Sequence, residues 1–328
     1  MKAIVYDVYG PPDVLSVQEV AKPEPREHEL LIRVRAAAVT TADCAARKGD
    51  PFITRLAFGL TKPKNRVLGT ELAGDVEAVG KGVTRFRPGD EIYAATGAAF
   101  GAHAEYLCLP EDGAVALKPS NLGYEEAAAL CEGPMTALPF LRDEGRVQRG
   151  QTVLINGASG SVGTAAVQLA KDFGAVVIGV CSTRNVELVR SLGADEVIDY
   201  TREDFTRRRS AYDVVFDAVG KSSFSRCKDS LRPSGVYLST VPTLTTGLHV
   251  LWTRFFGGKK ARLAFTGLRP PGEKSRDLEY LRELAEAGRI RAVIDRRYPW
   301  EDSAQAHRYV DEGHKTGTVL LTAVDERL

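Results

Sequence analysis

The stretch TVLINGASGSVGTAAVQLAK, residues Thr152–Lys171, decides the fold of this chain. A short apolar run, Val153–Ile155, leads into a turn that contains Gly157, Gly160 and Gly163. Apolar residues then recur at helical spacing, at Val162, Ala165, Ala166, Leu169 and Ala170. A strand, a glycine turn and a helix in this order are typical of the first unit of a dinucleotide-binding fold.

The glycine turn suits a pyrophosphate group. Glycines let the backbone pass close to the phosphates, and the N-terminus of the following helix offers free N–H groups and a partial positive charge. The spacing is G-x-x-G-x-x-G, and glycine clusters of this kind also occur in ordinary loops. The flanking strand and helix favour binding over a plain loop. We therefore predict a nicotinamide cofactor, held by Gly157, Ser159, Gly160, Ser161, Val162 and Gly163.

Composition excludes several classes of protein. The chain has 328 residues, 44% of them hydrophobic and 27% charged, which is ordinary for a globular protein of one or two domains. The formal net charge of +1 provides no strong field for nucleic acid. No apolar run approaches the length of a membrane span, and MKAIVYDVYG at the start is read as a strand. Five cysteines without regular spacing predict reduced thiols and a cytoplasmic location.

The rhythm of the sequence changes twice along the chain. Residues 1–122 carry short β-rich segments separated by Pro and Gly, which predicts a compact, barrel-like domain. Residues 123–265 alternate helical patterns with apolar strands, which predicts a parallel sheet of right-handed βαβ units. The final part, 266–328, returns to mixed character. The strands expected in the middle part are 153–155, 176–180, 196–198, 214–217 and 236–238.

The end of the second of these strands indicates which nicotinamide cofactor is bound. NAD-binding sheets place an Asp or Glu there to bind the adenosine ribose, but Cys181–Asn185 contains no acid. Ser182 and Arg184 are present instead, and a guanidinium can pair with a ribose phosphate through charge-assisted bonds. These residues predict NADPH. The alternative is that Ser182 or Thr183 only caps the next helix.

Two further residues are candidates for the adenosine end of NADPH. Tyr200 follows the third strand and is expected to lie over the adenosine pocket. Lys315 is a second candidate for the ribose phosphate.

Several segments resemble signatures of the medium-chain dehydrogenase/reductase superfamily, specifically its zinc-free quinone oxidoreductase branch. They are AVTTADCAARKGD (38–50), LGTELAGDVEAVG (68–80), RFRPGDEIYA (85–94), RGQTVLINGASGSVGTAAVQLAK (149–171), DVVFDAVG (213–220) and LRPSGVYLST (231–240). The resemblance implies an α/β protein in which a GroES-like, β-rich catalytic domain (1–122), completed by 266–328, accompanies a Rossmann cofactor domain (123–265). One departure lies in the glycine turn, where the family usually has two adjacent glycines and this chain has Gly160-Ser161. A side chain at Ser161 is tolerable if φ is negative there, and its hydroxyl can add a phosphate contact.

The resemblance also allows a test for zinc. Zinc-dependent members carry Cys and His ligands at positions where this chain has Thr40, Thr70 and Glu132. The soft thiolate and the imidazole are both missing, and so is the cysteine quartet of a structural zinc lobe. The sequence predicts no metal.

Without a Lewis acid, soft acceptors such as quinones and α,β-unsaturated carbonyls are the expected substrates. The resemblance places the loop of Thr40 and Thr41 beside the nicotinamide, where their hydroxyls are expected to stabilise the charge on the acceptor oxygen. It also places Thr136 near the nicotinamide ribose, although Thr136 has an alternative role as a helix N-terminal hydroxyl. No proton donor is identified from the sequence, and solvent is one candidate.

The predicted function is an NADPH-dependent quinone or enone reductase. The alternatives are a zinc-independent reductase of aldehydes or other carbonyls, and a non-catalytic NADPH-binding protein with a sensory or RNA-binding role. The segment 239–266 contains apolar and aromatic residues suited to pairing two cofactor sheets edge to edge, so a homodimer is expected.

Overall fold

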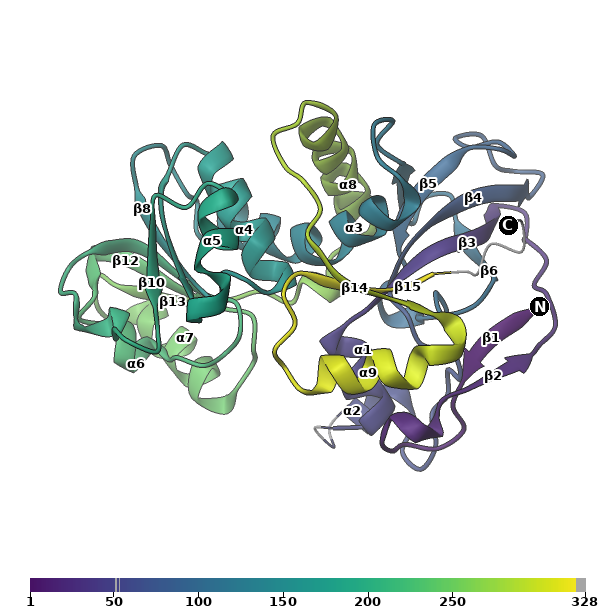
Figure 1. The fold of residues 1–328 in the computed structure, drawn as a ribbon, viewed down its shortest axis with the longest axis horizontal. Helices are drawn as coiled ribbons and strands as arrows, with labels where there is room; N and C mark the ends of the chain where they lie inside the picture. The colour runs from purple at the N-terminus through teal and green to yellow at the C-terminus, as the bar shows by residue number, and fades with distance from the viewer. Residues whose placement is uncertain (51, 53, 323–328) are drawn as a thin grey trace. The chain divides into compact units, whose positions relative to one another are not determined.

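The computed structural model describes residues 1–50, 52 and 54–322. The chain forms two compact units, one of Met1–Glu132 with Gly267–Leu328 and one of Gly133–Thr266 (Figure 1). Residues 123–132, which we expected in the cofactor domain, therefore group with the first unit. Residues 323–328 of the expected C-terminal segment lie outside the described residues.

The second unit is built on a parallel sheet. Its strand order is β10-β9-β8-β11-β12-β13, which is the 3-2-1-4-5-6 order of a dinucleotide-binding sheet. The predicted parallel sheet is thus confirmed. The strands are β8 (Thr152–Asn156), β9 (Val176–Cys181), β10 (Glu196–Asp199), β11 (Tyr212–Asp217), β12 (Leu231–Ser239) and β13 (Lys260–Leu263).

Helices connect these parallel strands. The helix that follows the glycine turn buries most of its residues against the sheet, as its apolar spacing predicts. The α-helices are α4 (Ser161–Asp172), α5 (Val186–Ser191), α6 (Phe224–Cys227) and α7 (Leu244–Phe255). Shorter segments are the π-helix η3 (Phe140–Glu144) and the 3₁₀ turns η4 (Thr183–Asn185) and η5 (Phe205–Arg207).

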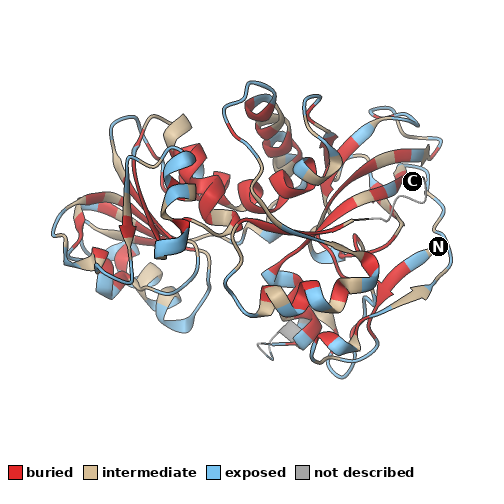
Figure 2. Ribbon diagram, in the orientation of Figure 1, coloured by how far each residue is buried: buried red, intermediate tan, exposed pale blue. Residues whose placement is uncertain are grey.

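The first unit contains a mostly antiparallel sheet, ordered β14-β15-β3-β4-β5-β7, with β6 also pairing β3. Its inward-facing apolar residues form one large core, and Figure 2 shows much of β3 and β4 buried. The strands of this sheet are β3 (Glu29–Val39), β4 (Glu71–Val79), β5 (Glu91–Ala95), β6 (Tyr106–Pro110), β7 (Ala114–Leu117), β14 (Ile294–Pro299) and β15 (Thr318–Thr322), and a separate two-stranded sheet consists of β1 (Lys2–Val5) and β2 (Ser16–Glu19).

The helices of the first unit come from both ends of the chain. They are α1 (Thr41–Lys48), α2 (Thr54–Phe58), α8 (Pro271–Glu286) and α9 (Ser303–Asp311), with 3₁₀ turns η1 (Pro12–Val14), η2 (Gly97–Ala99), η6 (Thr266–Leu268) and η7 (Trp300–Asp302). Helix α3 (Tyr124–Pro139) contains the point at which the two units divide. Among the described residues, no helix is long and apolar enough to cross a bilayer.

A buried ion pair joins α1 to α9. The Arg47 side chain is fully buried, and its Nη2 donates to Asp311 Oδ2 over 2.6 Å. Lys48 reaches the other oxygen of Asp311 at 2.7 Å. Burial opposes ionisation of Asp311, but the bonds from Lys48 and Arg47 outweigh it and lower the pKa of this carboxyl. The N-terminal and C-terminal parts of the first unit are therefore joined at the C-terminal end of the helix that follows Thr40.

Candidate active site

The glycine turn after β8 has one side that is closed by packing and another that is open. Gly157 has φ +81°, and a Cβ there would lie 2.4 Å from Val219 Cγ1. A Cβ on Gly163 would lie 2.0 Å from the Gly157 carbonyl oxygen. A Cβ on Gly160, in contrast, would meet only that oxygen, at 3.7 Å. The turn is therefore packed tightly at its first and third glycines and keeps space beside the middle one.

The N-terminus of α4 begins in this turn. Gly160 is the N-cap residue, and because it has no side chain it supplies no capping hydrogen bond to the first N–H groups of the helix. Ser161 is the first helical residue; it is buried and does not have a positive φ, so its side chain causes no backbone strain. Val162 follows it, partly buried. The backbone cradle and a helix N-terminus whose N-cap residue is a glycine fit the pyrophosphate of a dinucleotide.

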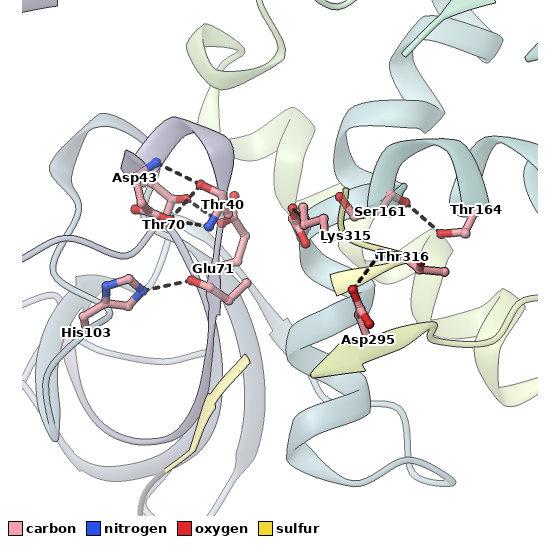
Figure 3. A network of polar contacts seen from close by, with 12 residues as sticks. Thr40, Asp43, Thr70, Glu71, His103, Ser161, Thr164, Asp295, Lys315 and Thr316 are labelled. Atoms are coloured by element: carbon pink, nitrogen blue, oxygen red, sulfur yellow. Dashed lines mark hydrogen bonds and ion pairs between the residues drawn. The ribbon is translucent and has the colours of Figure 1, made fainter. Parts of the chain in front are cut away.

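Side chains hold the turn in place from outside. Asn185 Nδ2 donates to Ser159 Oγ over 2.9 Å, which joins the turn to the residues that follow β9. The Thr164 hydroxyl donates to the Ser161 carbonyl within α4, as Figure 3 shows. Ser159 thus has a structural bond as well as its predicted phosphate contact.

The residues after β9 do not cap the following helix through a side chain, so the capping alternative is wrong, whereas the predicted contact of Ser182 and Arg184 with a ribose phosphate stays a prediction. Ser182 is partly buried and makes no side-chain capping bond, and Arg184 is exposed. Thr183 does not cap α5, because its hydroxyl donates to Asp199 Oδ2 over 2.5 Å. Asp199 ends β10 in register with Cys181 at the end of β9.

Asp199 is a residue that sequence reasoning missed. It introduces a carboxylate beside Ser182 and Arg184, and hydrogen bonds from the hydroxyls of Thr183 and Thr201 lower its pKa. The signal was available, because the carboxyl ends of neighbouring parallel strands meet at one edge of the sheet. Tyr200, next in sequence, is 57% exposed.

A second missed residue, Asp217, lies at the point where the strand order reverses. Its side chain is fully buried at the end of β11 and accepts from Asn156 Nδ2 at 3.0 Å and from the Tyr237 hydroxyl at 3.0 Å. It also accepts from the Ser222 backbone N–H at 2.8 Å. These bonds fix the ends of β8 and β11, where ligands of open α/β sheets bind.

Thr136 lies in the last turn of α3 and is partly buried. Its alternative role as a hydroxyl at a helix N-terminus is therefore wrong. Its predicted contact with a nicotinamide ribose stays a prediction.

In the first unit, Thr40 and Asp43 form a reciprocal capping box at the start of α1 (Figure 3). Asp43 Oδ2 accepts from the backbone N–H and the hydroxyl of Thr40, at 2.9 and 2.7 Å, while Thr40 Oγ1 accepts from the Asp43 N–H at 3.0 Å. The Thr40 proton is therefore directed to Asp43, whereas Thr41 is exposed. The predicted role of both hydroxyls as donors to an acceptor oxygen stays a prediction, and this geometry favours Thr41.

Asp43 also organises the start of β4. Its other oxygen, Oδ1, accepts from the Gly69 N–H at 2.9 Å, so the Thr40 loop and the segment Gly69–Glu71 share one buried carboxylate. Beside it, the Thr70 hydroxyl donates to Glu71 Oε2. Burial, reinforced by the negative charge of Asp43, raises the pKa of Glu71 to about 8.

Lys315 and Glu132 complete this group. Lys315 Nζ donates to Glu132 Oε1 over 2.6 Å, and the two side chains are only 10% and 9% exposed. The predicted contact of Lys315 with a ribose phosphate stays a prediction, which this buried ion pair disfavours. Within residues 1–50, 52 and 54–322, no group of three or more His, Cys, Asp and Glu side chains could hold a metal ion.

Sequence reasoning missed Asp43 and Glu71 for different reasons. The spacing of Thr40 and Asp43 is a readable capping signal, T-x-x-D before a helical pattern. Nothing local identifies Glu71, because its raised pKa depends on burial and on Asp43, 28 residues earlier in the sequence.

Known proteins resemble this chain over its full length. Two family models match it, the alcohol dehydrogenase GroES-like domain over residues 26–119 and a model described as zinc-binding dehydrogenase over residues 192–321. A quinone oxidoreductase of Pseudomonas aeruginosa is 33% identical, over 98% of this chain and 99% of its own. A chloroplastic NADPH-dependent alkenal/one oxidoreductase of Arabidopsis thaliana is 34% identical, over 98% of this chain and 79% of its own. The solved quinone oxidoreductase from Coxiella burnetii has a TM-score of 0.87 at 31% identity and covers 99% of both chains.

Two glycine substitutions separate packing from binding in the turn. Gly163→Ala forces a Cβ against the Gly157 carbonyl and should lower the free energy of unfolding by roughly 3 kcal/mol. Gly160→Ala meets no such contact and should cost about 1 kcal/mol, yet its methyl group enters the cradle and should weaken dinucleotide binding. Urea unfolding and fluorescence titration with the dinucleotide measure the two effects. Equal losses of stability in both variants would contradict this division.

Proposed function

Because the chain belongs to the quinone oxidoreductase branch of the medium-chain dehydrogenase/reductase superfamily, we propose that it is a zinc-independent, NADPH-dependent reductase of quinones or α,β-unsaturated carbonyls. The observation that carries the proposal is a dinucleotide cradle in a chain that has Thr40, Thr70 and Glu132 at the zinc-ligand positions. The names of the Pseudomonas and Arabidopsis relatives support the choice of acceptor. The five cysteines, all described and all free, support a cytoplasmic location, which cell fractionation tests.

The residues divide the work of binding and orientation. The turn at Gly157–Gly163 and the start of α4 would hold the pyrophosphate, Ser182, Arg184 and Tyr200 the adenosine end, and Thr136 the nicotinamide ribose. NADPH supplies a hydride when bound. The hydroxyls of the Thr40 loop would face the acceptor oxygen, where a hydrogen-bond donor stabilises the negative charge that develops during reduction.

Activity can be tested directly by following NADPH oxidation at its absorbance band. We expect turnover with a quinone and with an enone, and little with the matched saturated ketone, because a simple carbonyl needs a Lewis acid. Dialysis against a chelator should leave the rate unchanged. An aldehyde tests the alternative of a general carbonyl reductase. If NADPH binds but no acceptor raises the rate, the reductase proposal fails.

Cofactor preference depends on two opposite charges near the end of β9. Arg184→Ala should weaken NADPH binding about tenfold, because a charge-assisted bond to phosphate is lost. Asp199→Asn should strengthen NADPH binding, because it removes a carboxylate that repels the phosphate. NADH has no such phosphate, so its affinity in both variants serves as the control. An unchanged ratio of NADPH to NADH affinity in Arg184→Ala would show that the assignment is wrong.

We also propose that the chain forms a homodimer through the sheet edge at β13 and the neighbouring helix α7. β13 is the last strand of the parallel sheet, and α7 with its C-cap exposes a stripe of apolar side chains. They are Leu244, Leu248, Leu251, Trp252, Phe255 and Phe256. Light scattering should give the mass of a dimer for the wild type and of a monomer for Leu248→Glu. Val8→Glu, at an exposed apolar residue of the first unit, should remain dimeric; a monomeric wild type contradicts the proposal.

A further inference from the structure

The hydroxyls of Thr40 and Thr70 each donate to a carboxyl group, but the two carboxyl groups differ in how many other hydrogen bonds they accept. Thr40 donates to Asp43, whose two oxygens together accept three bonds, from the Thr40 N–H, the Thr40 hydroxyl and the Gly69 N–H. That carboxylate is fully used as an acceptor. Thr70 donates to Glu71, for which no backbone N–H donor is recorded in the described residues. The Thr70–Glu71 pair can therefore reverse its hydrogen bond, with Glu71 donating and Thr70 released to donate elsewhere.

The charges around Glu71 favour its protonated form. Asp43, on α1, presents a negative charge to it, and so does Glu132 on α3, although Glu132 is paired with Lys315. Lys274 on α8 is the other nearby cation; its Nζ donates to a backbone carbonyl, and burial and a neighbouring arginine lower its pKa.

A further neighbour of Glu71 is the Cys131 thiol, on α3. It donates to the Ala94 carbonyl at 3.2 Å, and burial raises its pKa well above the usual value. This thiol is therefore neutral and adds no charge to the group. Together these surroundings raise the pKa of Glu71 to about 8, so Glu71 carries a proton at neutral pH.

We propose that Thr70 and Glu71 form a proton relay, in which Thr70 passes a proton to the acceptor oxygen and Glu71 replaces it. This inference rests on the proposed reductase function and names the proton source of that reaction. In this proposal the Thr70 hydroxyl would contact the acceptor, so Thr70 would be the catalytic residue and Glu71 would act through it. Thr70 directly follows Gly69, whose N–H donates to the Asp43 carboxylate. The same carboxylate accepts the bonds that fix the Thr40 loop.

The relay balances the reduction. The acceptor gains a hydride, and negative charge collects on its oxygen. The Thr70 O–H bond then breaks and its proton forms an O–H bond on the acceptor, while the Glu71 proton moves to Thr70 Oγ1. Hydride and proton together make a two-electron reduction, and Glu71 is left as a carboxylate. Water returns one proton to Glu71 before the next turnover.

The surroundings of Glu71 also limit how tightly it holds its proton. The nearby Lys315 and the bond from Thr70 both favour the carboxylate, and so they counteract the effects of burial and Asp43. A group whose pKa lies near the working pH is the most effective proton donor, because it is protonated and still releases the proton readily.

The pH dependence of kcat/KM follows with a definite sign. The proton is present below the pKa of Glu71 and is lost above it, so activity should fall as the pH rises through about 8. Glu71→Gln keeps a hydrogen bond to Thr70 but has no proton to release. We expect kcat to fall about 100-fold and KM to change less than about twofold. The fall of kcat/KM at high pH, the basic limb of the pH profile, should disappear. Glu71→Asp should restore part of kcat together with the limb.

Matched variants separate the relay from loss of structure. Thr70→Ser keeps the hydroxyl and should remain active, whereas Thr70→Val has a similar shape and should lose activity as Glu71→Gln does. Glu77→Gln changes an exposed carboxylate on the same strand, paired only with Lys22 at the surface, and should leave the profile unchanged. A carboxyl carbon titration by NMR, in the chain without cofactor, measures the Glu71 pKa directly and needs no variant to be active.

The outcomes distinguish the two proposals. An NMR pKa of Glu71 in the ordinary range for a carboxyl overturns the relay, whatever the activity. A wild type that reduces quinones or enones while Glu71→Gln keeps its basic limb and kcat overturns the relay and leaves the reductase function standing. A wild type inactive with every acceptor overturns both. Loss of the limb in Glu71→Gln, with Thr70→Ser active and Thr70→Val inactive, supports the relay.

Discussion

The geometry of the candidate site in the first unit depends on the hydrogen bonds that the buried carboxylate of Asp43 accepts. It receives two bonds from Thr40 and one from the backbone of Gly69, and so it holds the start of α1 against the start of β4. A carboxylate with no solvent exposure is stable only when its oxygens are hydrogen-bonded, so losing any one donor would destabilise the whole group. The Arg47–Asp311 pair fixes the far end of the same helix. Helix α1 is therefore held at both ends.

A different constraint, close backbone packing, shapes the dinucleotide cradle. Gly163 lies where a Cβ would overlap the Gly157 carbonyl, and a Cβ on Gly133 would lie 2.2 Å from the Ser161 carbonyl. The N-terminus of α4 thus packs between the turn and the interior of α3, and neither Gly133 nor Gly163 has space for a side chain. Gly160 has that space. The helix N-terminus therefore packs closely at Gly133 and Gly163 and leaves room for a phosphate at Gly160.

Local patterns made the sheet and the turn predictable, and long-range contacts limited the rest. Five of the six strands of the second unit, β8 to β12, and the cradle glycines follow from periodicity over a few residues, whereas the edge strand β13 was not predicted. Asp199 follows the third strand and was missed because an acid was expected only after the second; the pairing of β9 and β10 brings it to Thr183. Lys315 was predicted as a candidate for the ribose phosphate because it is a cation. Its ion pair with Glu132 could not be foreseen, because the two residues come together only in the fold.

The raised pKa of Glu71 agrees with the proposed class of acceptor, quinones and α,β-unsaturated carbonyls. A Lewis acid polarises a carbonyl before hydride arrives, whereas a proton relay helps only once negative charge has formed on oxygen. Reduced quinones carry that charge on a phenolic oxygen, whose pKa is about 10 in tyrosine. Transfer from a carboxyl with a pKa of about 8 to such an oxygen is favourable by roughly 3 kcal/mol. An unperturbed carboxyl would be deprotonated at neutral pH and would have no proton to give. The burial that raises the pKa of Glu71 therefore suits acceptors that stabilise charge themselves, and it would do little for a simple ketone, whose difficulty lies in the hydride step.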